Sequence, residues 1–126
     1  MPYAVSHDPE QDLVEVKFIG LVSGDDLRKA TTECVELQRS TGAMRFLIDV
    51  NESELKASTL DIYDIPGKQY LDEGVDRRSR FAVILPDAPR PRKAAYFYEA
   101  ACRNRGWNAR VLPDHESALE WLTGAQ

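Results

Sequence analysis

The chain has 126 residues, of which 43% are hydrophobic and 29% are charged, a balance typical of one globular domain. A domain near this size buries roughly two-thirds of its unfolded surface, so it can form a core without disulfides or metals. The formal net charge is −5 at pH 7, but residues 1–76 carry 7 basic and 16 acidic side chains, whereas residues 77–126 carry 9 and 5. This acidic balance excludes a general nucleic-acid binder, whose affinity comes mostly from phosphate neutralisation.

Three features of the sequence indicate the cellular compartment. The apolar runs are much shorter than the ~20 residues that cross a bilayer, and the start MPYAVSHDPE lacks the basic and apolar regions of a secretory signal. Cys34 and Cys102 stand far apart and outside any CxxC pattern. We therefore expect a cytoplasmic protein with both thiols reduced and no membrane span.

The chain opens with the pattern of a β-hairpin. Residues 3–6 form a short apolar run that ends before Pro9, a turn signal. Residues 13–19 then alternate between apolar and charged side chains, which predicts a half-buried strand paired with the first. Gly20 is expected to end this strand.

A helix and a central strand are expected next. Ser23 followed by Asp26 is typical of a helix N-terminus, because the hydroxyl accepts a free backbone N–H and the acid favours the positive end of the helix dipole. Apolar residues recur at helical spacing up to Gly42, which provides the stop. The mostly apolar residues 44–50 predict a strand covered on both faces.

The following helix carries an interruption. Ser58 and Asp61 repeat the capping pattern, and apolar residues follow. Pro66-Gly67 then breaks the pattern, since proline lacks an N–H and clashes with the preceding turn. We expect a kinked or two-piece helix over residues 59–73.

Four elements complete the chain. Residues 81–85 predict a buried strand, and Pro91 opens a strongly amphipathic helix that Gly106 ends. Residues 109–112 predict a short strand, and Asp114 caps a last helix.

The order ββαβαβαβα predicts an α/β fold in a single domain over residues 1–126. The opening hairpin is antiparallel, whereas strands joined through helices run parallel. We therefore expect a mixed five-stranded sheet covered by four helices.

This order, the segment FLIDVNESELKASTL and the closing strand–helix pair resemble the STAS fold, and in particular its SpoIIAA-like branch of anti-sigma-factor antagonists. The resemblance implies a regulatory module in which a strand-end aspartate leads into an Asp-Ser-Ser/Thr-Gly motif with a phosphorylated serine. Placing Asp49 on that aspartate puts Ser58 on the motif, although Ala57 replaces the acid and Leu60 the glycine. Ser58 is thus a possible phosphosite, and a helix N-cap is the interpretation that we prefer.

Three acids, Asp49, Asp87 and Asp114, each follow a predicted strand. Carboxyl ends of parallel strands line the usual ligand crevice of open sheets, and clustered carboxylates can hold Mg²⁺. We prefer local roles for them: a backbone-binding acid, a turn and a helix cap.

Other catalytic and metal patterns are missing. His7 and His115 pair with no nucleophile at a recognisable spacing, and neither GxxxxGK[ST] nor GxGxxG occurs. Cys34 and Cys102 fall on apolar helix faces, which indicates core residues. We expect no metal, no cofactor and no enzymatic activity.

Basic residues flank the 81–85 strand at both ends, and the second group lies at a helix start, where an anion or an acidic partner is an alternative to plain solvation. They are Arg77, Arg78 and Arg80 before it, and Arg90, Arg92 and Lys93 after it.

Two functions remain open. The first is a regulatory module that binds a protein partner or a second copy of itself. Its interaction face would be the polar side of the 91–105 helix, formed by Arg92, Tyr96, Glu99 and Arg103, since tyrosine and arginine are enriched in interfaces. The alternative is a carrier or sensor of a small apolar, lipid-like ligand. Its pocket would lie beside the second helix, lined by Tyr63, Tyr70, Phe97 and Tyr98.

Overall fold

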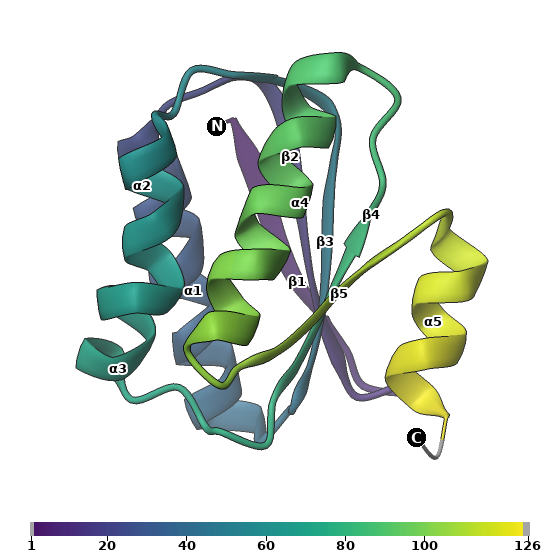
Figure 1. Ribbon diagram of the computed structural model, residues 1–126. Helices are drawn as coiled ribbons and strands as arrows, with labels where there is room; N and C mark the ends of the chain where they lie inside the picture. Colours follow the sequence, from purple (N-terminus) through teal and green to yellow (C-terminus); the bar gives the residue numbers. More distant parts are fainter. Residues whose placement is uncertain (1, 125–126) are drawn as a thin grey trace.

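Five strands form one mixed sheet in the computed structural model, which describes residues 2–124 (Figure 1). The strands lie side by side in chain order; β1 and β2 are antiparallel, and all later pairs are parallel. They are β1 (Tyr3–Asp8), β2 (Leu13–Val22), β3 (Arg45–Leu55), β4 (Arg80–Ile84) and β5 (Asn108–Leu112). The predicted fold class is confirmed.

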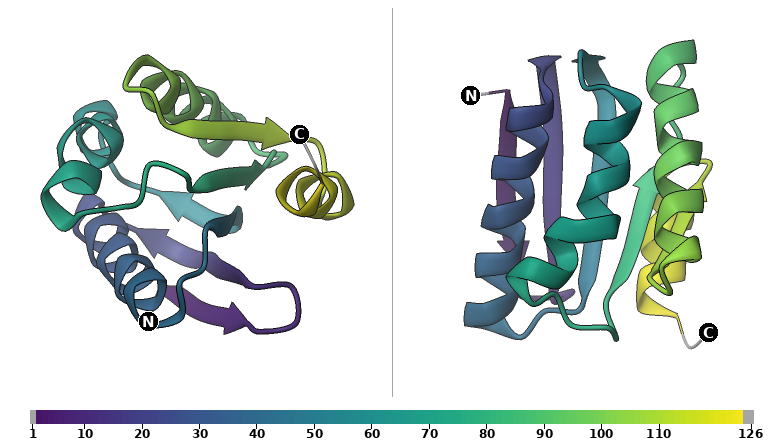
Figure 2. Two further views of the ribbon diagram at one scale, coloured as in Figure 1. Left: turned by 90° about the horizontal axis from the view of Figure 1, so that it is seen from below. Right: turned by 60° about the vertical axis from the view of Figure 1, so that its left-hand side comes forward.

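The helices cover the sheet unequally. They are α1 (Gly24–Thr41), α2 (Thr59–Asp64), the π-helical turn η1 (Ile65–Gln69), α3 (Tyr70–Glu73), α4 (Pro89–Asn104) and α5 (His115–Thr123). We call the continuous run α2–η1–α3 the second helical segment. This segment, α1 and α4 pack on one face, and α5 alone packs on the other (Figure 2). Within residues 2–124, no helix has the length and apolar character needed to cross a membrane.

Strand β3 lies at the centre of the sheet and is buried on both faces. Phe46 belongs to the core beneath α1 and α4, whereas its neighbour Leu47 belongs to the smaller core beneath α5. Successive side chains of a strand point to opposite faces, so a strand covered on both sides needs the unbroken apolar run that the sequence contains.

Side-chain caps fix the starts of three helices as predicted. Ser23 Oγ accepts a hydrogen bond from Asp26 N at 3.1 Å, and the Asp26 carboxylate accepts one from Ser23 N at 2.9 Å. Ser58 and Asp61 form the same reciprocal capping box at the start of α2. Asp114 caps α5 by accepting a hydrogen bond from Ser117 N at 2.8 Å.

Strands β2 and β3 both extend beyond their predicted ends. Gly20 does not end β2; it pairs with Ser53 and has a φ of 72°, a conformation that glycine adopts without steric cost. Beyond a register shift after Lys17, β2 and β3 stay paired as far as Leu55. Asp49 therefore lies inside β3, not at its end as expected.

The predicted interruption near Pro66 takes the form of a π-helical turn. Proline has no N–H to donate within a helix, and the chain widens here into one turn of π-helix instead of separating into two helices. Trp107 stabilises the turn from the side, because its Nε1 donates a hydrogen bond to the Pro66 carbonyl oxygen at 3.1 Å.

The capping geometry generates a prediction about stability. Ser58→Ala removes the acceptor for Asp61 N and should lower the free energy of unfolding by about 1 kcal/mol, measured by urea denaturation. Ser23→Ala, which removes the same cap from α1, is the matched comparison. An unchanged stability for Ser58→Ala beside a loss for Ser23→Ala would contradict a contribution of the α2 cap.

Candidate functional site

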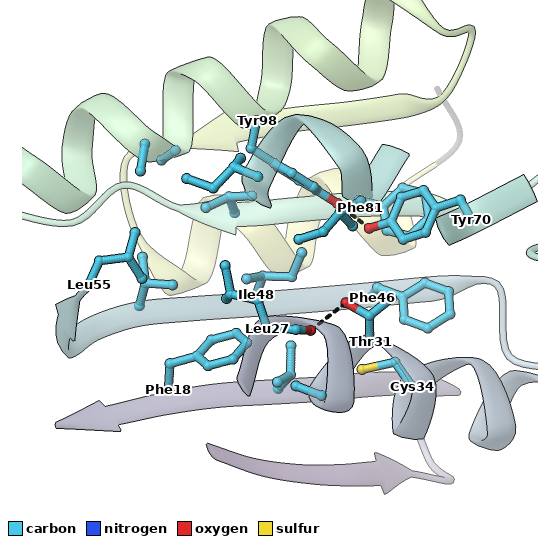
Figure 3. A pocket seen from close by; sticks show the side chains of 18 of the residues that line it. Phe18, Leu27, Thr31, Cys34, Phe46, Ile48, Leu55, Tyr70, Phe81 and Tyr98 are labelled. Carbon is cyan, nitrogen blue, oxygen red and sulfur yellow. Dashed lines mark hydrogen bonds between the residues drawn. The ribbon is translucent and has the colours of Figure 1, made fainter. Parts of the chain in front are cut away.

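A cavity of about 100 Å³ lies between the sheet and the three helical elements on its more covered face (Figure 3). Strands β2, β3 and β4 form its floor, and α1, the second helical segment and α4 form its walls. Its lining consists of Val16, Phe18, Leu27, Ala30, Thr31, Cys34, Val35, Phe46, Ile48, Val50, Leu55, Ile62, Ile65, Tyr70, Val75, Phe81, Val83, Pro91, Ala94, Ala95 and Tyr98.

Small side chains on the helices leave this space unfilled. Ala30 and Cys34 of α1, together with Ala94 and Ala95 of α4, line the cavity above large side chains of the strands. Protein interiors are normally close-packed, so short side chains at several facing positions leave a void unless a larger residue fills it. No single short stretch of the sequence indicates this void, because the small residues come from helices far apart in the chain.

The few polar atoms in the lining come from hydroxyl and thiol groups. Tyr70 and Tyr98 point toward one another, and their hydroxyl oxygens are 2.5 Å apart (Figure 3). Thr31 Oγ1 donates a hydrogen bond to the Leu27 carbonyl oxygen at 2.8 Å. None of the lining residues carries a charge.

Both tyrosines are neutral at physiological pH. Tyr70 is 5% exposed and Tyr98 is 8% exposed. Burial disfavours the phenolate and raises the pKa of each hydroxyl well above its ordinary value. The Cys102 thiol lies near the Tyr98 hydroxyl, one turn along α4. The cavity therefore presents uncharged hydrogen-bonding groups.

The structure separates the four aromatic residues proposed as a pocket. Tyr70 and Tyr98 line the cavity, but Tyr63 and Phe97 do not. Tyr63 is 38% exposed, and its hydroxyl accepts a hydrogen bond from Arg105 Nη2. Phe97 is partly buried and packs against the core.

The three strand-end acids do not form a shared site. Asp49 accepts a hydrogen bond from Asn51 N at 2.9 Å, and Asp114 is the cap of α5. Asp87 lies exposed in the loop after β4. Among residues 2–124, no group of three or more His, Cys, Asp or Glu side chains is placed to hold a metal ion.

The two histidines lie at the periphery. His7 Nε2 is 3.1 Å from Asp12 Oδ1, and His115 Nε2 is 3.8 Å from Glu15 Oε2. Neither histidine lines the cavity.

The basic residues before β4 contact other parts of the protein, whereas those after β4 lie exposed on α4. Arg77 lies over the Trp107 ring, with its guanidinium carbon 3.8 Å from the ring centroid, and Arg78 pairs with Asp76 at 2.9 Å. Arg80 Nη1 donates a hydrogen bond to the Trp121 carbonyl oxygen at 2.9 Å. The second group, Arg90, Arg92 and Lys93, is exposed in the first turns of α4.

The expected interaction face on α4 is only partly free. Tyr96 is 48% exposed, and Arg92 and Arg103 are exposed as well. Glu99 is engaged inside the molecule, because its Oε2 accepts a hydrogen bond from Val111 N of β5 at 2.7 Å. The carboxylate thus caps one backbone N–H on the outer edge of the sheet.

A charged groove lies between α1 and the second helical segment and is separate from most of the cavity. Arg28 donates a hydrogen bond to Asp61 Oδ1 at 3.2 Å across the groove, and Thr32 donates one to Glu73 Oε2 at 2.9 Å. These contacts join α1 to the second helical segment, so the groove is a line of polar contacts between the two elements.

Comparisons with known proteins identify the fold. A crystal structure of an uncharacterized protein from the DUF3478 family with a SpoIIAA-like fold, from Shewanella loihica PV-4, is similar, with a TM-score of 0.60 and 21% sequence identity. The match covers 95% of this chain and 93% of that chain. No protein-family model and no curated protein matches. The SpoIIAA-like fold suggested by the sequence is thus confirmed.

The cysteines are core residues, as predicted. Cys102 is fully buried, and Cys34 is 8% exposed and lines the cavity. Burial raises the pKa of both thiols to about 12, so neither forms an appreciable thiolate near neutral pH.

This burial leads to a prediction about thiol reactivity. At pH 8, Ellman's reagent should label neither cysteine in the native protein and both after unfolding in guanidinium chloride. The absorbance of the released thiolate measures the number of labelled groups. Rapid labelling of the native protein would show that at least one thiol is accessible, contrary to its place in the core.

Proposed function

We propose that this protein is a non-enzymatic carrier or sensor that binds a small apolar ligand in the cavity between the sheet and its helices. The observation that carries the proposal is the cavity itself, about 100 Å³ of space lined mainly by apolar side chains. A somewhat larger apolar cavity, of about 150 Å³, stays dry and accepts benzene or xenon. The expected ligand is therefore no larger than a small hydrocarbon ring, unless the walls move apart.

The energetics of the cavity support binding. An unfilled cavity costs about 24 cal/mol per Å³, which gives roughly 2 kcal/mol for this volume. A ligand that fills the space restores the missing contacts, and it leaves water without losing strong hydrogen bonds. Binding would therefore stabilise the folded protein in proportion to occupancy.

Filling the cavity with a protein side chain tests this proposal. Ala95→Leu extends a buried side chain on the cavity wall, whereas Ala100→Leu makes the same change on the exposed side of the same helix. Benzene at ten times its Kd should stabilise the wild type by about 1.4 kcal/mol and raise its melting temperature by a few degrees. Ala100→Leu should keep this shift, and Ala95→Leu should lose it.

Two results would contradict binding in this cavity. If benzene leaves the melting temperature of the wild type unchanged up to its solubility limit, the cavity does not bind apolar molecules. If Ala95→Leu retains the full shift, binding takes place elsewhere on the protein.

A second candidate function is protein interaction, for which the exposed Tyr96 on α4 is the favouring observation. Arg92 and Arg103 lie exposed on the same side of the helix, and this combination of residues is typical of interface centres. The partner would be another protein or a second copy of this chain. Phosphorylation of Ser58, which is exposed at the start of α2, remains a prediction within this function.

Substitution of the α4 face tests the second function. Tyr96→Ala combined with Arg103→Glu should leave the melting temperature nearly unchanged, because exposed substitutions usually alter stability by less than ~0.5 kcal/mol. If the face is an interface, this double variant should sediment as a smaller species or lose its partner in a pull-down. Leu71→Ala, at a residue 55% exposed on α3, is the matched control. Unchanged assembly and partners would leave Tyr96 as ordinary surface.

A further inference from the structure

Only one of the two hydroxyl hydrogens of Tyr70 and Tyr98 has a strong acceptor in the protein. Each phenol carries one hydrogen, and the 2.5 Å contact between the two oxygens uses only one of them. The hydroxyl that accepts this bond must direct its own hydrogen elsewhere. Both side chains are more than nine-tenths buried, so the missing acceptor has to come from inside the cavity.

The two possible arrangements differ in where the second hydrogen goes. If Tyr70 donates to Tyr98, the Tyr98 hydrogen has no strong acceptor, because the nearby Cys102 sulfur accepts hydrogen bonds only weakly. If Tyr98 donates to Tyr70, the Tyr70 hydrogen has no protein acceptor: within residues 2–124, Tyr98 is the one hydrogen-bond partner of the Tyr70 hydroxyl. Tyr70 lines the cavity, so an acceptor placed there by a ligand would favour the second arrangement.

The rest of the lining restricts the charge of such a ligand. No cationic side chain lines the cavity, so a carboxylate or phosphate would be buried without a counter-charge. No carboxylate lines it either, which disfavours an ammonium group for the same reason. A neutral acceptor, such as a carbonyl oxygen, requires only the one phenolic donor that the site offers.

We propose that the cavity recognises a small neutral molecule with an apolar body and one carbonyl oxygen, which accepts a hydrogen bond from the Tyr70 hydroxyl. This inference rests on the proposed function and specifies its ligand class. The apolar body fills the space above the strands, and Tyr98, by donating its hydrogen to Tyr70, orients the Tyr70 donor toward the ligand.

Two probes of matched shape test the donor. Cyclopentanone and methylenecyclopentane are both five-membered rings, and they differ in carrying an exocyclic oxygen or an exocyclic CH₂ group. Tyr70→Phe removes the donor and keeps the ring. We expect this substitution to weaken cyclopentanone binding roughly five-fold, the equivalent of one net hydrogen bond, and to leave methylenecyclopentane binding unchanged. Calorimetric or NMR titration measures both affinities.

A second variant controls for a general effect of a Tyr→Phe substitution on packing. Tyr98→Phe removes the partner of Tyr70 but leaves the Tyr70 donor in place, so the preference for the ketone should persist. The carbonyl stretching band of bound cyclopentanone should lie at lower wavenumber in the wild type and in Tyr98→Phe than in Tyr70→Phe.

The outcomes separate the two proposals. If both probes bind the wild type and Tyr70→Phe changes them equally, the carbonyl assignment is wrong while the cavity remains a binding site. If only methylenecyclopentane binds the wild type, the carbonyl assignment is likewise wrong, and the cavity remains a binding site. If neither probe binds, both the ligand class and the proposed function fail.

Discussion

One buried hydrogen bond, between the hydroxyls of Tyr70 and Tyr98, joins the second helical segment to α4 on the side of the helices that faces the sheet. Two phenols removed from water would each lose a hydrogen bond, so their pairing is the condition for burying both. The Tyr70 ring also stacks on Phe81, with centroids 4.9 Å apart, and meets the edge of Trp107 at 5.3 Å. These contacts hold the end of the segment against the sheet.

The same arrangement determines where the core is left open. The Tyr70–Tyr98 and Trp107–Pro66 hydrogen bonds fix the position of the second helical segment relative to α4 and the sheet. The helices on either side present short side chains, such as Ala30 and Ala95, toward the space that remains. The cavity is thus a consequence of a fixed helix position and small facing residues.

Much of the fold could be predicted from local patterns, because each pattern has a local physical cause. Alternation in β2 and the Ser–Asp capping boxes depend on neighbouring residues, and both were predicted in place. The extension of β3 to Leu55 was missed, since it depends on pairing with β2 beyond a register shift. The residue pattern of one strand does not show how far its pairing with a distant strand extends.

The candidate site was predicted only in part. Tyr63 and Tyr70 are seven residues apart and would share one face of a regular α-helix. The π-helical turn between them changes that phase, so Tyr70 is buried in the cavity wall while Tyr63 faces outward to Arg105. The cavity itself was beyond prediction from one sequence, since it is a space among side chains from six elements.

A crystal structure of the protein under xenon pressure would test the central claim most directly. Xenon enters dry apolar cavities and is located by its own strong scattering. We predict one xenon atom between Cys34, Tyr98 and the β3 side chain of Ile48, and its loss in Ala95→Leu. A cavity that stays empty of xenon in the wild type, or that is filled by ordered water, would contradict an apolar binding site.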